Sequence, residues 1–143
     1  MNFSAALDKQ GAGAFMRLMP ITLILIALGG ALGAVLRYLS VKTALNLLGP
    51  AFPWGTLLVN VAGSLLMGLA AALILEKTGG GRLQLFLMTG VLGGFTTFSA
   101  FSLDALALIE RGKLAASAAY IGGSVLLSIF ALVVGLWAGR TLA

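Results

Sequence analysis

Two sets of uncharged polar residues recur at intervals of four within otherwise apolar stretches of the chain. The first set is Thr56, Asn60 and Ser64, and the second set is Tyr120, Ser124 and Ser128. Residues four apart lie along one face of a helix. Hydroxyl and amide groups donate hydrogen bonds to an anion without holding it by a full charge, and such weak sites suit conduction. The first set is equally consistent with a hydrogen-bond cluster between helices. The second set favours an anion pathway.

A segment rich in glycine and threonine follows in the third apolar stretch. The run is Gly93-Gly94-Phe95-Thr96-Thr97, and it is a poor sequence for a continuous helix. We predict a helix that is broken at mid-span, whose carbonyl and amide groups must be buried in protein or bind an ion. A kinked but well-packed helix is the alternative. In a homodimer, two such breaks near the two-fold axis would form a small cage of carbonyl oxygens for a cation.

Three phenylalanines, Phe95, Phe98 and Phe101, recur at every third position through the same segment. Such a stripe is usually core or a lipid-facing surface. The edge of an aromatic ring is electropositive, so ring edges facing a pathway would attract a small anion. Spacing alone does not decide between these interpretations.

The chain has no histidine and no cysteine. This excludes histidine general bases, thiolate nucleophiles, disulfides and zinc sites of the Cys/His type. No nucleophile–base pair or metal cluster is visible either, so an enzyme is the weakest of the possible classes.

Charged residues are placed at the boundaries of the apolar stretches, Asp104 and Glu110 among them. A proton-coupled exporter normally needs a carboxylate or histidine inside a span as its relay. The sequence therefore argues against a small proton-coupled drug or metabolite exporter, which remains the alternative. Arg37 is the one candidate for a semi-buried cation, either drawing anions into a vestibule or reaching the membrane interface.

The composition requires a membrane. The 143 residues are 60% hydrophobic and 9% charged, with a mean hydropathy of +1.10, whereas a soluble domain is about 25% charged. We predict an all-α membrane protein with a polar N-terminal tail (1–17) and one four-helix domain (18–143). The predicted helices cover about 18–45, 51–75, 83–103 and 114–139. Pairs of small residues four apart, such as Gly29 and Gly33, predict close helix packing.

Basic residues are almost evenly divided between the two sides of this arrangement. One side carries five (Lys9, Arg17, Lys77, Arg82 and Arg140) and the other carries four (Arg37, Lys42, Arg111 and Lys113). The positive-inside rule needs a clear excess on one side. We therefore predict insertion in both orientations and antiparallel pairing of two chains as a homodimer. The basic residues are scattered singly, which is typical of membrane flanks rather than of a nucleic-acid-binding patch.

Three motifs together resemble the bacterial fluoride channels of the Fluc (CrcB) family. They are GGALGAVLRY at residues 29–38, GTLLVNVAGS at residues 55–64 and GGFTTFSAFS at residues 93–102. Their order and spacing match the first three helices of that family, over residues 29 to about 104. The fourth helix fits in length and position.

The resemblance implies a dual-topology homodimer in the bacterial inner membrane that passes fluoride passively and relieves its toxicity. It implies a structural sodium ion at the third-helix breaks, held by the backbone carbonyls of Gly93 and Thr96 from both chains. The residues implied for the fluoride pathway are Asn60, Thr97, Phe98, Ser99, Phe101, Tyr120, Ser124 and Ser128, with Arg37 near a vestibule. Ala100 and Asp104 depart from the family's usual Thr and Glu.

Overall fold

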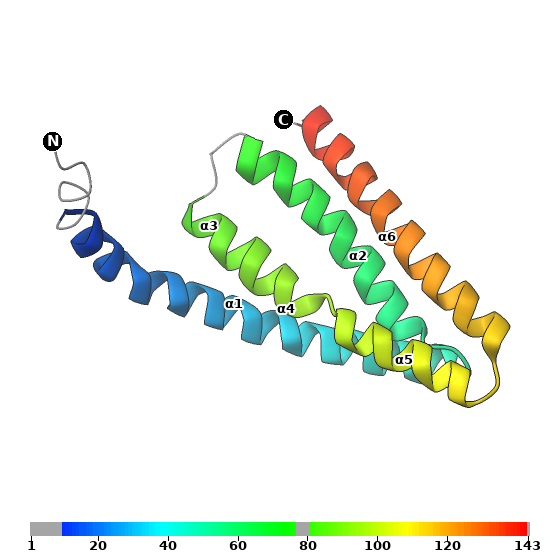
Figure 1. Ribbon diagram of the computed structural model, residues 1–143. Helices are drawn as coiled ribbons and strands as arrows, with labels where there is room; N and C mark the ends of the chain where they lie inside the picture. The colour runs from blue at the N-terminus through cyan, green and yellow to red at the C-terminus, as the bar shows by residue number, and fades with distance from the viewer. Residues whose placement is uncertain (1–9, 77–80, 143) are drawn as a thin grey trace, which may run out of the picture.

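The computed structural model describes residues 10–76 and 81–142. Every regular element in these ranges is a helix (Figure 1), in agreement with the predicted all-α class. The elements are α1 (Gln10–Leu48), α2 (Trp54–Ala70), η1 (Ala71–Glu76), α3 (Arg82–Gln84), η2 (Leu85–Leu92), α4 (Gly93–Phe95), α5 (Phe98–Glu110) and α6 (Leu114–Leu142). The two η elements are π-helical, with wider turns than an α-helix.

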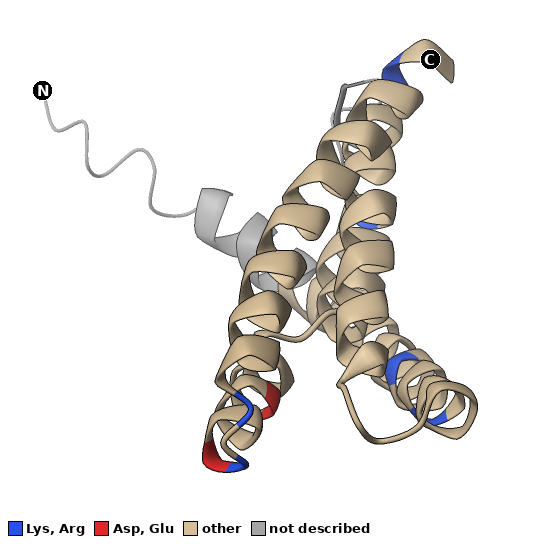
Figure 2. Ribbon diagram, turned by 90° about the vertical axis from the view of Figure 1, so that its right-hand side faces the viewer, with Lys and Arg blue, Asp and Glu red and all other residues tan. Residues whose placement is uncertain are grey.

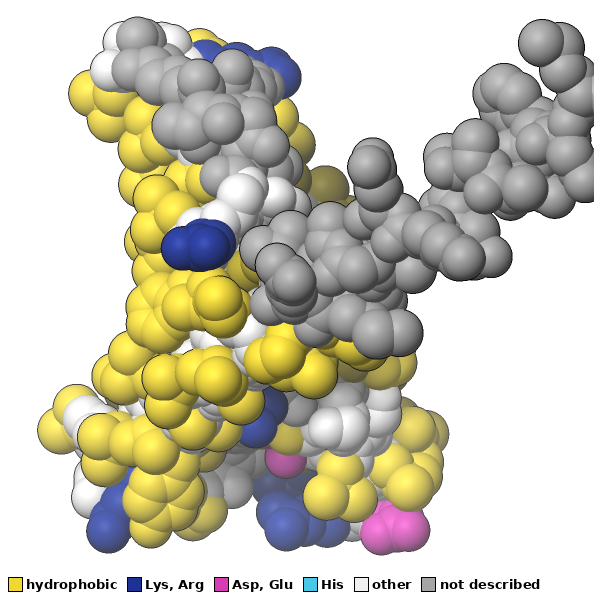
Figure 3. All heavy atoms as spheres, turned by 90° about the vertical axis from the view of Figure 1, so that its left-hand side faces the viewer, with side chains coloured by type: hydrophobic (Ala, Val, Ile, Leu, Met, Phe, Trp, Pro, Cys, Tyr) yellow, Lys and Arg dark blue, Asp and Glu magenta, His cyan; other side chains and the backbone are white. Residues whose placement is uncertain are grey.

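Four stretches are long and apolar enough to cross a membrane. They are Met19–Leu48, Trp54–Ile74, Arg82–Glu110 and Leu114–Leu142. Many large apolar side chains on them are exposed, and hydrophobic side chains cover most of the described part of the face in Figure 3. Such a surface suits lipid rather than water. The chain is a multi-pass membrane protein.

The spans form two groups that diverge. α2 and α6 run side by side, while α1 packs against η2 and α4 and diverges from α6 toward its N-terminal end (Figure 1). In the view turned by 90° (Figure 2), positions of basic residues lie near both the upper and the lower end of the ribbon. The predicted tail at 1–17 is described only in part, because residues 10–17 begin α1 and residues 1–9 lie outside the described ranges.

Glycines set the contacts within each group, as the small-residue pattern predicted. A Cβ atom on Gly33 would overlap the Val91 carbonyl oxygen, and one on Gly135 would overlap the carbonyl oxygen of Leu65. These helices therefore touch backbone to backbone, which in lipid substitutes for a hydrophobic driving force.

The third span ends later than the sequence suggested. α5 ends at Glu110. The chain then turns at Gly112, whose φ of 71° is a conformation that glycine adopts at low cost. The N–H of Lys113 donates to the Leu108 carbonyl and that of Gly112 to the Ile109 carbonyl, which is the Schellman pattern. Asp104 therefore lies inside α5, about two turns before its end, and not at a boundary.

Candidate functional site

The third span is interrupted by two residues in extended conformation. Thr96 has φ −77° and ψ 159°, and Thr97 has φ −154° and ψ 121°. The side chain of Asn60, on α2, binds Thr97 at both polar groups of its backbone. The Thr97 N–H donates to Asn60 Oδ1 at 2.8 Å, and Asn60 Nδ2 donates to the Thr97 carbonyl at 3.0 Å.

This arrangement releases the carbonyl oxygens of residues 93–96 from helical hydrogen bonding, those of Gly93 and Thr96 among them. In an α-helix, Gly93 would accept from the N–H of Thr97, and Thr96 from the N–H of Ala100. Here the Thr97 N–H is taken by Asn60, and the Ala100 N–H donates to Thr97 Oγ1 at 3.2 Å as an N-cap. The Thr96 carbonyl accepts instead from Arg37 Nη1 at 3.2 Å.

Free backbone carbonyls are suitable ligands for a hard cation. The described residues contain no group of three or more Asp, Glu, His or Cys side chains that could hold a metal. The carbonyls of Gly93 and Thr96 are among the oxygen donors that this region offers, and they fit the ligand set that the family resemblance implies.

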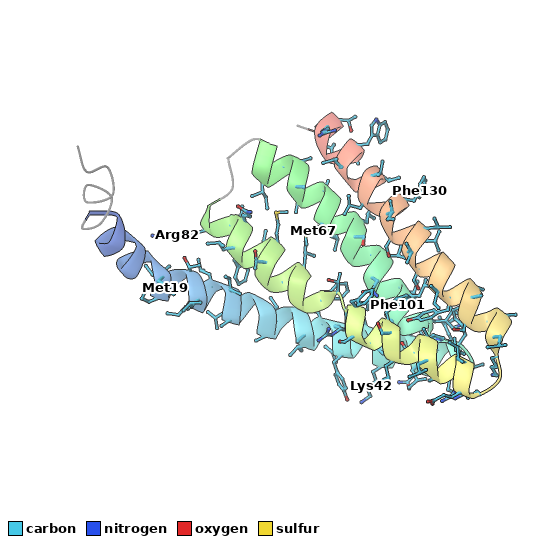
Figure 4. All side chains as sticks on the ribbon, viewed as in Figure 1. Met19, Lys42, Met67, Arg82, Phe101 and Phe130 are labelled. Carbon is cyan, nitrogen blue, oxygen red and sulfur yellow. The ribbon has the colours of Figure 1, made fainter. Side chains whose placement is uncertain are left out.

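A groove of about 490 Å³ opens beside the interruption, between α2, α5 and α6. Eight of the predicted site residues line it: Asn60, Gly93, Thr96, Thr97, Phe98, Phe101, Ser124 and Ser128. None of its lining residues is charged. Figure 4 labels two of the lining residues, Met67 on α2 and Phe101 on α5. The sequence therefore selected residues from four helical segments that the fold brings to one surface.

The remaining three predicted residues lie one contact away from this groove. The Tyr120 ring is fully buried behind Phe101, with centroids 5.3 Å apart. The Ser99 hydroxyl lies 3.3 Å from Thr97 Oγ1, and Arg37 reaches the Thr96 carbonyl as described.

The two groove phenylalanines differ in what supports them. Phe101 is 9% exposed and belongs to the core cluster with Tyr120 and Leu57. Phe98 is 78% exposed, and its ring centroid lies 5.4 Å from that of Phe101. Within one chain, Phe101 therefore holds the fold together, whereas Phe98 projects from it.

Ser124 is the polar group in the groove that most needs a partner. It is 4% exposed, and its hydroxyl has no hydrogen-bond partner among the described residues. An unsatisfied buried hydroxyl is costly and calls for a specific explanation. Since Ser124 lines the groove, a ligand there is one such explanation.

The sequence did not identify Asp104 as part of this region. Asp104 Oδ2 accepts a 2.6 Å hydrogen bond from Thr56 Oγ1 and a 3.3 Å bond from the Tyr120 hydroxyl. Both donors belong to the polar stripes on the second and fourth spans. A carboxylate thus lies inside a span, and the argument that no span contains one is wrong. The available signal was the spacing of Asp104 from Phe101, which is three residues and therefore places both on one helix face.

A second pocket, of about 200 Å³, lies beside the hydrogen bond between Thr56 and Asp104. Thr56, Asp104 and Arg111 line it, together with the loop between α1 and α2. A series of polar groups therefore leads from this pocket through Thr56, Asp104 and Tyr120 to the groove at Phe101 and Ser124.

These features define a helical membrane protein with an uncharged polar groove beside an interrupted span. A family profile described as "CrcB-like protein, Camphor Resistance (CrcB)" matches residues 24–136. The chain belongs to this family, which confirms the resemblance found in its motifs.

Similar proteins cover nearly the same length. The "Fluoride-specific ion channel FluC" of Rhizobium etli (strain CIAT 652) is 55% identical over 124 residues, which are 86% of this chain and 99% of that protein. The protein of the same name from Agrobacterium fabrum is 53% identical over 85% of this chain and 98% of its own length. A third, from Cereibacter sphaeroides (strain ATCC 17029), is 56% identical over 83% of this chain and 94% of its own length. All three are named as ion channels, not enzymes.

Proposed function

We propose that this chain is one subunit of a fluoride channel that passes fluoride passively across the bacterial inner membrane and relieves its toxicity in the cytoplasm. The observation that carries the proposal is the uncharged groove with the unpartnered Ser124 hydroxyl. A hydroxyl donates a hydrogen bond to an anion and releases it again, as conduction requires. The names of the relatives support fluoride as the ion.

The proposed pathway follows the polar groups already described. It runs from the pocket at Thr56 and Asp104, past Tyr120, to the groove at Ser124 and Ser128. The rings of Phe98 and Phe101 present their electropositive edges to the ion. Phe98 is also the first residue of α5, and the N-terminus of a helix favours negative charge.

The proposed active form is an antiparallel homodimer. The nearly even distribution of basic residues supports insertion in both orientations. The groove in a single chain is open along one side, and the Phe98 ring beside it is largely exposed among the residues that the structure describes. A second, inverted chain would cover both.

A structural sodium ion completes the proposal, with the interruption of the third span placed at mid-membrane. Its ligands would be the Gly93 and Thr96 carbonyls of both chains. When bound, the ion would be coordinated by these four carbonyl oxygens and would link the two chains. The release of the Gly93 and Thr96 carbonyls from helical hydrogen bonds in each chain supports this assignment.

The test is efflux from liposomes that contain the purified protein. Fluoride and chloride are compared at matched gradients, without a proton gradient. We expect rapid fluoride efflux and no chloride efflux above that of empty liposomes. Efflux that requires a proton gradient would instead favour the proton-coupled exporter, with Asp104 as its relay. Equal loss of both anions would contradict a fluoride-specific channel.

A further inference from the structure

The role of Asn60 differs from that of a simple lining residue. Both polar ends of its side chain are engaged by the backbone of one residue, Thr97. Thr97 is 8% exposed. Its N–H and carbonyl are therefore buried groups that need partners. Asn60 replaces the helical acceptor that the N–H has lost and adds a second donor to the carbonyl, which as the N-cap also accepts the first hydrogen bond of α5.

We propose that Asn60 is a positioning residue, which holds the interruption open and thereby makes the Gly93 carbonyl available to a cation. This inference rests on the proposed function, and specifically on the central sodium ion. Without Asn60, the Thr97 N–H would be expected to form the ordinary helical hydrogen bond to the carbonyl of Gly93, four residues earlier. That carbonyl would then be hydrogen-bonded along the helix and lost as a ligand.

The neighbouring helix is shaped so that Asn60 can reach its partner. Gly63 lies on α2 about one turn after Asn60, and a Cβ atom there would overlap the Thr96 side chain and crowd the ring of Phe95. Gly63 thus lets α2 approach the interrupted segment closely. Asn60 lines the groove as well, so its effect on the cation must be separated from any contact with fluoride.

The experiment measures sodium binding through assembly, independently of flux. The dimer fraction of the purified protein in detergent is determined by cross-linking as sodium replaces N-methylglucamine at constant ionic strength. We expect Asn60→Leu, which has no polar side-chain atoms, to raise the sodium concentration for half-maximal dimer at least tenfold. If that variant does not fold by circular dichroism, Asn60→Ala removes the same hydrogen bonds with less bulk.

A second variant separates the two halves of the side chain. Asn60→Asp keeps an oxygen that accepts from the Thr97 N–H, so its half-maximal sodium concentration should stay within threefold of wild type or fall. Ser64→Ala is the matched control, because Ser64 lines the same groove one turn along α2. Its sodium dependence should equal that of wild type.

Two results would overturn the inference. The first is that Asn60→Leu or Asn60→Ala reduces fluoride efflux but leaves the sodium dependence of the dimer unchanged. Asn60 would then be a pathway residue only. The other is a tenfold rise in Asn60→Asp. If the wild-type dimer is insensitive to sodium, the inference and the sodium proposal fail together. Fluoride-selective efflux from the same preparation would still uphold the channel.

Discussion

Phe98 and Phe101 separate two roles that their spacing in the sequence could not distinguish. Phe98 is exposed in the single chain, whereas Phe101 is part of its core. We expect Phe98→Ile to reduce fluoride efflux at least tenfold while the chain keeps its thermal stability. Phe101→Ala should reduce both, because removing a buried phenylalanine costs about 3–5 kcal/mol. Unchanged efflux in Phe98→Ile would remove that ring from the pathway.

The hydroxyls that bind Asp104 predict an order of stabilities. The Thr56 bond to the carboxylate is short, at 2.6 Å, whereas the Tyr120 bond is 3.3 Å. Hydrogen bonds to charged groups contribute roughly 1.5–3 kcal/mol. Both bonds go to the same carboxylate, so the one with the shorter distance is expected to contribute more. Thr56→Val should therefore lower the free energy of unfolding more than Tyr120→Phe does. Denaturant titration in detergent measures both, and a reversed order would refute the assignment of the carboxylate's main partner.

We predict that replacing Arg37 raises the affinity for sodium, whereas replacing Asn60 lowers it. Its guanidinium donates to the Thr96 carbonyl, so it lies beside a proposed sodium ligand. Two positive charges about 5 Å apart repel by roughly 3 kcal/mol at an effective dielectric constant of about 20. Arg37→Gln should thus lower the sodium concentration needed for half-maximal dimer at least tenfold, in the cross-linking assay. An increase would mean that the guanidinium holds the carbonyl in place.

At the scale of helices, glycine substitutions should separate contact surfaces from open ones. A Cβ atom on Gly33 would overlap the backbone of the third span, whereas one on Gly30 meets nothing within 4 Å. Gly33→Ala should displace η2 and α4 from α1 and lower the melting temperature and the yield of folded protein. Gly30→Ala is the matched control, three residues earlier on the same helix, and should leave the melting temperature of the single chain unchanged. Equal effects would contradict the packing described here.

How much of this could be predicted from the sequence depends on the range of the interaction. Apolar stretches and glycine spacing are local patterns, and they predicted the four spans and the close packing. Gly93 to Thr97 also carried a local signal, because glycine and threonine favour helices poorly. The partners of Asp104 and Thr97 lie on helices far away in the sequence, at separations of 48 and 37 residues. No local pattern specifies such pairs, so the half-buried carboxylate and the two hydrogen bonds between Asn60 and Thr97 were missed.

For the whole molecule, the distribution of basic residues predicts a complementation experiment. Arg111→Gln with Lys113→Gln changes the count from five and four to five and two, and the positive-inside rule then favours one orientation. Arg17→Gln, Arg82→Gln and Arg140→Gln together give two and four, which favours the other. Each variant alone should lose most dimer and most fluoride efflux, and co-expression of the two should restore both. Full activity of either variant alone would contradict antiparallel pairing.

The open groove has a consequence for how a cell must produce this protein. A chain that has not met an inverted partner presents the groove and the exposed Phe98 ring to lipid. Polar groups facing lipid are costly, so such a chain should be a substrate for membrane proteases. The amount of protein that accumulates would then be set by the scarcer of the two orientations. If the chain inserts in both orientations as proposed, one gene with balanced flanking charges would supply both in similar numbers, and little of what is synthesised would be degraded.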